Sequence, residues 1–518
     1  MLTLRAWRLV GLPEERTTGI DMAQHPTDAV LVRVARTSPA AFPDQLTKAE
    51  SLGIAYIAAR LRQAGLGVEI LDGHISDLSL EVLFQRVLSQ RAPFVGISIM
   101  DSSEVENCLT LAMSIKKTRG PETYVTAGGH IATLLARKIL GSGSVDSVVL
   151  HEGEETTAEL CEKVIEGRDW KSVKGIAYLR NGRFCATPPR PRPDLNILPF
   201  PARDTLDDLM GTHGKFIVSL VSSRGCHKRC VFCTNHEFFG TWRPRTPESV
   251  VDEIEQLVTQ HNVKQIDFQD ATFIGPGKRG QERAREIADG IIRRRLPIKF
   301  RISCTPDSIE FGLFKHLKKA GLYGVNTGIE SGYQPALVYF NKFITVADNA
   351  RAFAVLSRLG LLHNSTIGFI MFRPSATFDE IKANLAFLKA HLSYISPVCL
   401  TNSLEFPPMT AQKDGGPLLG CTTGAFAESS SKVSLLRAGF NIISAYFLED
   451  YYRITAMSDG VRKKALKRWT GVVLRLAGDF LGECENADMA CDDARVLLRG
   501  LNALCCEKAK MFRMWLSA

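Results

Sequence analysis

Hydrophobic positions in the first 165 residues follow two alternating periodicities. Short runs rich in β-branched residues, such as AVLVRVA at 29–35 and FVGISIM at 94–100, predict buried strands. Segments such as SLGIAYIAARLRQAG at 51–65 have the spacing of a helix with a broad apolar face. The same pattern predicts strands at 67–72, 123–129 and 144–150, and helices at 81–90, 106–118 and 154–167. It indicates a parallel sheet covered by helices, in which ligands bind beyond the carboxyl ends of the strands.

A proline-rich segment interrupts this alternation. TPPRPRPDLNILPFPARD at 187–204 carries six prolines, which neither a packed helix nor a central strand accommodates, so we expect an extended linker. The alternation then resumes with strands expected at 215–223, 263–270, 298–304, 324–331, 364–372 and 395–403, separated by helices. About six strand–helix units predict a partial (β/α)6 barrel. A Gly/Ser/Thr-rich stretch at 414–432 precedes helical segments that run almost to the end.

These patterns predict an α/β protein in three parts. We expect a Rossmann-like N-terminal domain over residues 1–195, with its linker extending to about 204. The barrel follows over 205–398. A helical C-terminal region over 399–518 is expected to cap the active site.

Composition restricts the class of protein. Hydrophobic residues make up 45% and charged residues 23% of the 518 residues, as in a soluble globular protein. No apolar run reaches the roughly 18 residues of a membrane helix, and no signal peptide is recognisable, so we expect a cytoplasmic protein. The formal net charge is +9, but its basic clusters, 293–295 and 462–468, lie in helical patterns that favour solvated helix faces over nucleic-acid binding. Thirteen cysteines without a secretory signal favour metal or redox chemistry over disulfides.

The segment GCHKRCVFC at 225–233 places Cys226, Cys230 and Cys233 directly after the first predicted barrel strand. Clustered thiolates are soft ligands suited to zinc or to an iron–sulfur cluster. A structural zinc site usually takes four protein ligands, and only His227 or His236 could supply the fourth here. A cubane held by three cysteines instead leaves one iron open. A small zinc knuckle and chance clustering remain as alternatives.

The spacing Cys-x-x-x-Cys-x-Phe-Cys and the segment GIESG at 328–332 resemble the radical S-adenosylmethionine superfamily. The resemblance implies a four-iron four-sulfur (4Fe-4S) cluster whose open iron binds the amino and carboxylate groups of S-adenosylmethionine. An electron from the cluster then cleaves the sulfonium to a 5′-deoxyadenosyl radical. The cofactor contacts implied are Phe232 beside the adenine, Glu330, Gln269, Asp270, Arg301 and Ser303. As alternatives, Glu330 caps a helix and Arg301 makes a surface ion pair.

An ordered series in the first part, namely YIAARLRQAGLGVEILDG, VGIS, AGGHIAT, HEGEET and LPFPARD, resembles cobalamin-binding members of that superfamily. NKFIT at 341–345 and GFIMFRPSATFDE at 368–380 match the same subgroup. The resemblance covers roughly residues 28–395. It implies that Gly128 and Gly129 allow the backbone to approach the corrin. Further cobalamin contacts are expected from Ser98, His130, Thr133, Glu152 and Gly153. A simple tight turn is the alternative for the two glycines.

Asp72-Gly73-His74 superficially matches the start of Asp-x-His-x-x-Gly, in which histidine ligates cobalt. That motif follows the first strand of its domain, whereas this one follows the second, and position 77 is Asp instead of Gly. We therefore expect no histidine on cobalt, and we expect the loop at 36–50 to face its lower side.

The resemblance implies methylation of an unactivated carbon in a biosynthetic intermediate. Members of the subgroup also carry out cyclisations, ring contractions and methylation without radical initiation. A methylthiotransferase would need three cluster cysteines in the first part, where Cys108, Cys161 and Cys185 give poor support. A cobalamin or cluster sensor is the non-enzymatic alternative. Expected partners are a small-molecule or peptide substrate and an electron donor such as flavodoxin or ferredoxin. For the C-terminal cysteines, Cys421, Cys484, Cys491, Cys505 and Cys506, we expect buried free thiols.

Overall fold

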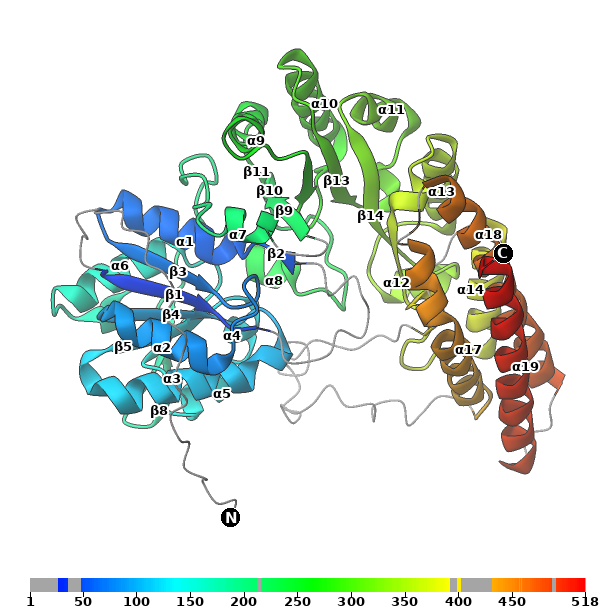
Figure 1. Ribbon diagram of the computed structural model, residues 1–518, viewed down its shortest axis with the longest axis horizontal. Helices are drawn as coiled ribbons and strands as arrows, with labels where there is room; N and C mark the ends of the chain where they lie inside the picture. The colour runs from blue at the N-terminus through cyan, green and yellow to red at the C-terminus, as the bar shows by residue number, and fades with distance from the viewer. Residues whose placement is uncertain are drawn as a thin grey trace.

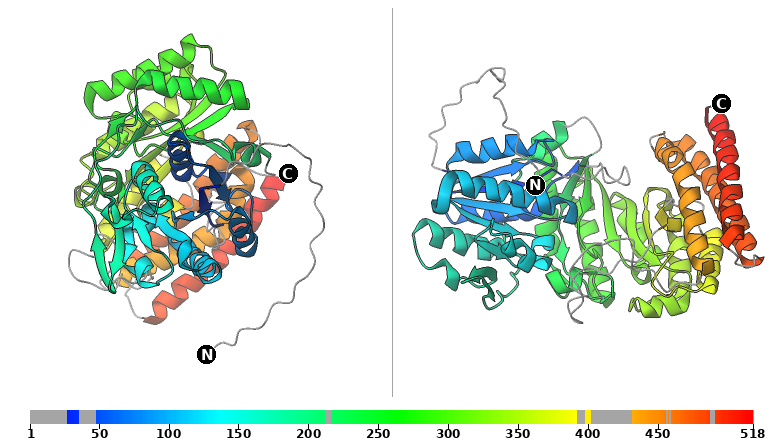
Figure 2. Two further views of the ribbon diagram at one scale, coloured as in Figure 1. Left: turned by 90° about the vertical axis from the view of Figure 1, so that its left-hand side faces the viewer. Right: turned by 90° about the horizontal axis from the view of Figure 1, so that it is seen from below.

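The computed structural model describes residues 27–35, 48–211, 216–391, 398–401, 431–455, 457, 459–486 and 491–517. An α/β domain, a curved parallel sheet with its helices, and a group of long helices follow one another along the chain (Figure 1). The α/β domain and the long C-terminal helices lie at opposite ends of the molecule, with the curved sheet between them (Figure 2). In the described part of the chain, no helix is both long and apolar enough to cross a membrane.

The N-terminal domain is built on a seven-stranded sheet of order β3-β1-β4-β5-β6-β7-β8. Its strands are β1 (Ala29–Arg33), β3 (Val68–Asp72), β4 (Phe94–Ser98), β5 (Tyr124–Gly128), β6 (Ser147–Val149), β7 (Ile176–Arg180) and β8 (Arg183–Ala186). All five residues of β1 are buried, because the strand lies inside the sheet and both of its faces are covered. The five strands predicted for this domain are therefore confirmed.

Helices cover both faces of this sheet. One apolar core joins it to α1 (Leu52–Gln63) and α6 (Glu154–Ile165), and a second joins it to α2 (Leu80–Gln90), α3 (Val105–Arg119), α4 (His130–Leu134) and α5 (Ala136–Gly141). The domain is thus a doubly wound α/β fold, as the pattern predicts.

The sheet is not parallel throughout, which corrects the expectation from sequence. β7 pairs antiparallel with β6, and β8 pairs antiparallel with β7. The hairpin between β7 and β8 turns at Asn181 (φ 51°) and Gly182 (φ 71°). Asn-Gly between two apolar segments is a strong hairpin signal, because both residues tolerate positive φ.

The second sheet has six parallel strands in the order β15-β14-β13-β12-β9-β2. Five come from the predicted barrel: β9 (Phe216–Leu220), β12 (Gln265–Phe268), β13 (Lys299–Cys304), β14 (Leu322–Glu330) and β15 (Thr366–Phe369). The sequence-based expectation of a sixth strand at 395–403 is wrong where the structure describes it, because Val398–Thr401 forms the short helix α15. The sixth strand is instead β2 (Lys48–Ala49), which pairs with β9 from upstream of the barrel.

The outer helices of this curved sheet are α9 (Pro247–His261), α10 (Gly277–Arg293), α11 (Phe311–Lys319), α13 (Val346–Arg358) and α14 (Phe378–His391). Helix α9 begins where the Thr246 hydroxyl accepts a hydrogen bond from Ser249 N, with Pro247 in the first turn, and ends at Asn262 in the left-handed conformation. Thr345, the last residue of NKFIT, caps α13 through a capping box with Asp348.

The C-terminal helices share one core with the barrel. Helices α17 (Ser431–Thr455), α18 (Asp459–Asn486) and α19 (Cys491–Ser517) contribute buried residues such as Phe447 and Trp469 to the same apolar cluster as β12 to β15. Cys484 and Cys505 are buried free thiols, as expected, whereas Cys506 is a free thiol that is only partly buried, so the expectation is wrong for its burial. Cys421 and the side chain of Cys491 lie outside the described residues.

Candidate active site between the two sheets

A cavity of about 670 Å³ lies between the N-terminal domain and the curved sheet. The carboxyl ends of strands from both sheets open into it, represented by Ser98 of β4, Gly128 of β5 and Ser219 of β9. Its lining also includes the expected cofactor contacts Gly129, His130, Glu152, Gly153, Gln269, Asp270 and Ser303. The structure thus brings residues predicted for two different cofactors to one open cavity, whereas Phe232, Glu330 and the three cysteines are not among the residues that line it.

The cysteine loop leaves β9 beside this cavity. Gly225, which lines the cavity, has φ +80°, and a Cβ there would lie 2.3 Å from Thr241 O, so only glycine fits. The turn is held by Cys226 N donating to Gly240 O at 3.2 Å and by Cys233 N donating to Cys230 O at 3.1 Å. These two hydrogen bonds fix the backbone at both ends of the loop.

The three cysteines of the loop lie close enough to influence one another electrostatically. The Cys226 thiol is affected by Cys233 and Lys342, and the Cys230 thiol by Cys226, Cys233 and Lys342. Burial raises the pKa of Cys226 and raises the pKa of Cys230 to about 11, so both thiols need a cation to become thiolates. Among the described residues, no group of three or more His, Cys, Asp or Glu side chains is arranged to hold a single metal ion. The choice between an iron–sulfur cluster and a zinc knuckle therefore rests on the cysteine spacing and on the comparisons given below.

Glu330 ends β14 with an unusual backbone and a buried carboxylate. Its φ is +62°, and the pairing of β14 with β15 shifts register between Gly328 and Glu330. A Cβ on Gly328 would lie 2.0 Å from Glu330 Oε1, so this glycine leaves room for the carboxylate. The Lys342 ammonium lies 2.6 Å from the same oxygen, and burial leaves the two side chains only 7% and 10% exposed. Glu330 therefore does not cap a helix; it forms a buried ion pair beside the cysteines.

The segment around Lys342 also holds the cysteine loop. Val231 N donates to Phe340 O at 3.1 Å, and Asn341 Nδ2 donates to Arg229 O at 2.9 Å. Phe232, expected beside the adenine, meets Phe340 edge to face with ring centroids 5.6 Å apart. NKFIT thus links the cysteine loop, Glu330 and the start of α13.

Gln269 and Asp270 follow β12 and differ in their surroundings. Gln269 Nε2 donates to Ser219 Oγ at 3.3 Å at the cavity wall. Asp270 is fully buried and accepts hydrogen bonds from the Ser222 and Ser223 hydroxyls and from Ser222 N. Burial raises the pKa of Asp270. These bonds show that Asp270 orients the chain that enters the cysteine loop.

Arg301 and Ser303 lie on the same face of β13, but only Ser303 lines the cavity. Arg301 Nε donates to Asp267 Oδ2 at 2.8 Å, and Asp267 Oδ1 also accepts the Tyr323 hydroxyl at 3.0 Å. Arg301 therefore forms an ion pair, as the alternative expectation had it, but with a residue of the neighbouring strand β12 and not at the surface. Arg301 does not line the cavity. Ser303 does line it.

On the N-terminal side, Gly129 most clearly requires glycine. Its φ is +102°, and a Cβ would lie 2.9 Å from Ile99 O. A Cβ on Gly128 would make only ordinary contact, 3.6 Å from Val149. Thr133 does not line the cavity; its hydroxyl donates to Gly129 O and accepts His151 N, so it holds the neighbouring loops.

His130 connects the two domains across the cavity wall. Its Nε2 lies 2.5 Å from Thr234 Oγ1, and its ring stacks on Phe238 of α8 (Asn235–Phe239) at 4.5 Å. Burial lowers the pKa of His130, and nearby His151 lowers it further. His130 therefore lines the cavity as a neutral interdomain contact.

Glu152 is buried between Arg224 of β10 (Ser223–Arg224) and Arg243 of β11 (Arg243–Pro244), two short strands that pair antiparallel on either side of the cysteine loop. It pairs with Arg243, and Arg224 Nη1 lies 3.7 Å from its second oxygen. Arg224 Nη2 also lies 2.7 Å from Glu154 Oε1 and stands over the Tyr56 ring. Burial raises the pKa of Glu152 despite these arginines. The Glu152 carboxylate thus forms ion pairs that connect the N-terminal domain to the strands beside the cysteine loop of the second domain.

The proline-rich linker carries a second buried connection. Arg203 of the linker lies 2.6 Å from Glu50 Oε2 and 2.7 Å from Glu253 Oε1 of α9. Glu253 also pairs with Arg245. Glu50 follows β2, so this network fixes the start of the N-terminal domain's first helix against the curved sheet.

His74 is not among the residues that line the cavity, in keeping with its exclusion as a cobalt ligand, which stays a prediction. Residues 36–47 of the loop expected below the cobalt lie outside the described residues. Of the remainder, Ala49 and Glu50 line the cavity. Arg33, at the end of β1, also lines it and donates to Ser51 Oγ at 2.7 Å.

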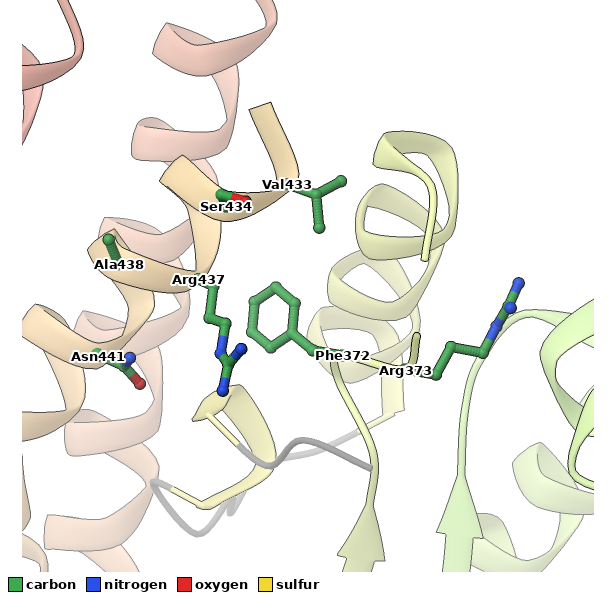
Figure 3. A pocket seen from close by; sticks show the side chains of 7 residues that line it. All are labelled: Phe372, Arg373, Val433, Ser434, Arg437, Ala438 and Asn441. Atoms are coloured by element: carbon green, nitrogen blue, oxygen red, sulfur yellow. The ribbon is translucent and has the colours of Figure 1, made fainter. Parts of the chain in front are cut away.

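A second hollow, of about 260 Å³, lies between the barrel and α17. Phe372 and Arg373 follow β15 on one side, and Ser434, Arg437 and Asn441 lie on the facing side of α17 (Figure 3). The Arg373 guanidinium points away from the α17 wall and pairs with Glu380. No described residue of the C-terminal region lines the larger cavity, so its expected capping role stays a prediction.

Sequence reasoning missed several residues that the structure brings to the site, above all Lys342, Arg33, Arg224 and Tyr56. Lys342 had a signal, because it lies in the quoted NKFIT match. Arg33 could also have been found from the sequence, because it is the single charged residue inside an apolar strand. The partners of Arg224 lie about 70 residues upstream, at Glu152 and Glu154, and no periodicity joins them.

Comparison with known proteins agrees with both halves of the site. The B12 binding domain family matches residues 46–161, and the Radical SAM superfamily matches residues 220–388. A Pyrococcus horikoshii protein named as an uncharacterised methyltransferase is 30% identical over 370 residues, covering 70% of this chain and 76% of that one. The anaerobic magnesium-protoporphyrin IX monomethyl ester cyclase of Rubrivivax gelatinosus is 29% identical over 325 residues, covering 60% of this chain and 57% of that one.

The fold has a solved counterpart. The cobalamin-dependent S-adenosylmethionine radical enzyme OxsB, solved with aqua-cobalamin and S-adenosylmethionine bound, superposes with a TM-score of 0.75 at 20% identity. The match covers 92% of this chain and 75% of OxsB. Together with the cysteine loop and the interdomain cavity, these matches place the chain in the cobalamin-binding radical S-adenosylmethionine enzymes, whose cofactors are cobalamin, S-adenosylmethionine and a 4Fe-4S cluster.

Proposed function

We propose that this chain is a C-methyltransferase that acts on an unactivated carbon of a biosynthetic intermediate. The observation that carries the proposal is the single cavity into which the carboxyl ends of both sheets open, with the cysteine loop at its side. When bound, the cluster supplies the electron that cleaves S-adenosylmethionine, and cobalamin supplies the methyl group that is transferred. The chain spans 76% of the relative named as a methyltransferase, which supports the same class.

The residues have separable tasks in this proposal. Cys226, Cys230 and Cys233 hold the cluster. Glu330 and Lys342, which pair with each other beside the cysteines, carry the charges that would bind the α-ammonium and the α-carboxylate of S-adenosylmethionine. Gly129 and Ser98 leave space for the corrin.

The interdomain ion pairs keep the two halves of the cavity in register. Arg203 joins Glu50 to Glu253, and Arg224 joins β10 to Glu152 and Glu154. Charges that are buried and paired from both domains are costly to separate. They therefore hold the cobalamin side and the S-adenosylmethionine side at a fixed distance.

A cyclase or rearranging enzyme is the second candidate, favoured by the relative named as a cyclase. The chain spans little more than half of that relative's length, 57%. We also expect a small-molecule or peptide substrate, an external low-potential electron donor and a reducing, cytoplasmic setting, because the cluster is reduced in each turnover.

Transfer of the methyl group tests the proposal. The reduced, reconstituted chain is given S-adenosylmethionine with a deuterated methyl group, and bound cobalamin is analysed by mass spectrometry. A methyltransferase passes the deuterated methyl to cobalamin. Formation of 5′-deoxyadenosine with no label on cobalamin would instead support the cyclase, and neither product would support a sensor. Cys185→Ala, which changes a cysteine of β8 far in sequence from the loop, is the matched control for variants of the cluster cysteines.

A further inference from the structure

The solvent-facing side of α18 is basic along most of its length. From Val461 to Gly478 every exposed charged side chain is a lysine or an arginine, namely Lys463, Lys464, Lys467, Arg468 and Arg475, whereas the last turns of the helix expose the acidic residues Asp479, Glu483 and Glu485. A solvated helix usually mixes both signs, and α10 of this chain does so with Lys278, Arg279, Glu282, Glu286, Asp289 and Arg293. Within the described residues, Lys463, Lys464 and Lys467 form no ion pair, so their charge is not neutralised there.

Apolar side chains project beside this basic face. On α19, Met511 is 57% exposed and Met514 is 74% exposed, and Val461 at the start of α18 is 57% exposed. The two helices meet where the Arg468 guanidinium stands 4.3 Å from the Trp515 ring centroid. The basic residues of α18 and the exposed methionines of α19 thus belong to two helices in contact through Arg468 and Trp515. These helices lie at the end of the molecule far from the N-terminal domain (Figures 1 and 2).

We propose that this α18–α19 surface (Lys463, Lys464, Lys467, Arg468, Met511 and Met514) docks on an anionic lipid bilayer. Lysines and arginines are attracted to the phosphates of anionic headgroups, while methionine and valine side chains enter the boundary between headgroups and acyl chains. The docking is peripheral, and it does not depend on the proposed methyl transfer because none of these residues lines the cavity.

Two other occupants fit the surface less well. Single-stranded nucleic acid needs aromatic rings on which bases stack, and Trp515 is already covered by Arg468. A second copy related by a twofold axis would place basic α18 against basic α18, which like charges oppose.

Vesicle flotation tests the proposal with the full chain. Wild type should float with vesicles of phosphatidylcholine and phosphatidylglycerol but not with phosphatidylcholine alone. Binding should fall at about 1 M salt, where the Debye length is about 3 Å. The variant Lys463→Glu/Lys464→Glu/Lys467→Glu should bind more than about tenfold more weakly. The matched variant Lys278→Glu/Arg279→Glu/Arg293→Glu on α10 should bind like wild type.

The contribution of the two methionines is tested separately by Met511→Ser/Met514→Ser. This variant should bind vesicles more weakly than wild type, but its binding should depend on salt as that of wild type does. Circular dichroism and iron content confirm that each variant is folded. Equal binding of the α18 and α10 variants, no flotation of wild type, binding to DNA but not to vesicles, or a dimer that the α18 variant dissociates would each overturn the proposal.

Discussion

Lys342 Nζ lies 2.6 Å from Glu330 Oε1, and both side chains are buried beside the three cluster cysteines. The pair joins the end of β14 to the turn that precedes α13, so two segments twelve residues apart meet at the cysteine loop. A buried charge without its partner is expensive, because the low-dielectric surroundings do not solvate it.

Removing Lys342 should therefore destabilise the chain even without cofactors. We expect Lys342→Met to lower the free energy of unfolding by about 3–5 kcal/mol, because it leaves Glu330 buried and unpaired. The double variant Glu330→Gln/Lys342→Met should lose less than the sum of the two single variants. Anaerobic urea unfolding measures the free energy of unfolding of the cofactor-free wild type, the two single variants and the double variant. Simple additivity would show that the two side chains do not interact.

Glu330→Gln should weaken S-adenosylmethionine binding in addition to the loss of stability that follows from leaving the Lys342 ammonium buried and unpaired. It keeps the size of the side chain but loses a charge-assisted hydrogen bond worth about 1.5–3 kcal/mol, so affinity should fall roughly ten- to a hundredfold. Iron and cobalamin contents should stay near those of wild type. Affinity is measured by calorimetry alongside 5′-deoxyadenosine production. Unchanged values would make Glu330 a structural carboxylate, and loss of iron and cobalamin together would point to folding.

The cobalamin side is tested by a pair of substitutions. His74→Ala should leave the absorption spectrum of bound cobalamin unchanged, because His74 does not line the cavity. Ser98→Phe adds a ring at the cavity wall and should abolish cobalamin binding while iron content is retained. A changed absorption spectrum of cobalamin bound to His74→Ala would show instead that His74 is a ligand of cobalt.

His130 should make the domain contact sensitive to acid. Burial lowers the pKa of His130 below its ordinary 6.5, so the unfolded chain takes up the proton first as pH falls. The stability it contributes is present above about pH 6.5 and is lost as pH falls toward the lowered pKa. Thermal unfolding between about pH 7.5 and about pH 5.5 should thus show a smaller loss of stability in His130→Asn than in wild type. Equal losses would contradict this role.

Local patterns were enough to predict most of the fold. The alternation of strands and helices located β1, β12 and α9, because each carries its own periodicity or caps. The hairpin at Asn181-Gly182 was missed although its turn signal is present. The pairing of Lys48–Ala49 with β9 joins residues about 170 positions apart, and no local pattern reports such a contact.

In the candidate site, too, some residues could be placed from local patterns and others could not. The position of Gly128 and Gly129 in the cavity wall follows from their placement at the end of a strand, and the roles of Cys226, Cys230 and Cys233 stay a prediction from their spacing. Which polar residues face a cofactor does not follow, because Glu152 and Arg301 find their partners across the fold and are taken up by ion pairs. Distinguishing a ligand contact from a buried ion pair needs the tertiary structure.

A 4Fe-4S cluster on Cys226, Cys230 and Cys233 is central to the proposed function, and reductive cleavage of S-adenosylmethionine by the reconstituted chain tests this cluster most directly. Wild type and Cys185→Ala should bind about four irons per chain and form 5′-deoxyadenosine when reduced. Cys226→Ala/Cys230→Ala/Cys233→Ala should bind cobalamin but neither hold iron nor form that product. A triple variant that keeps its iron and still cleaves S-adenosylmethionine would contradict the account.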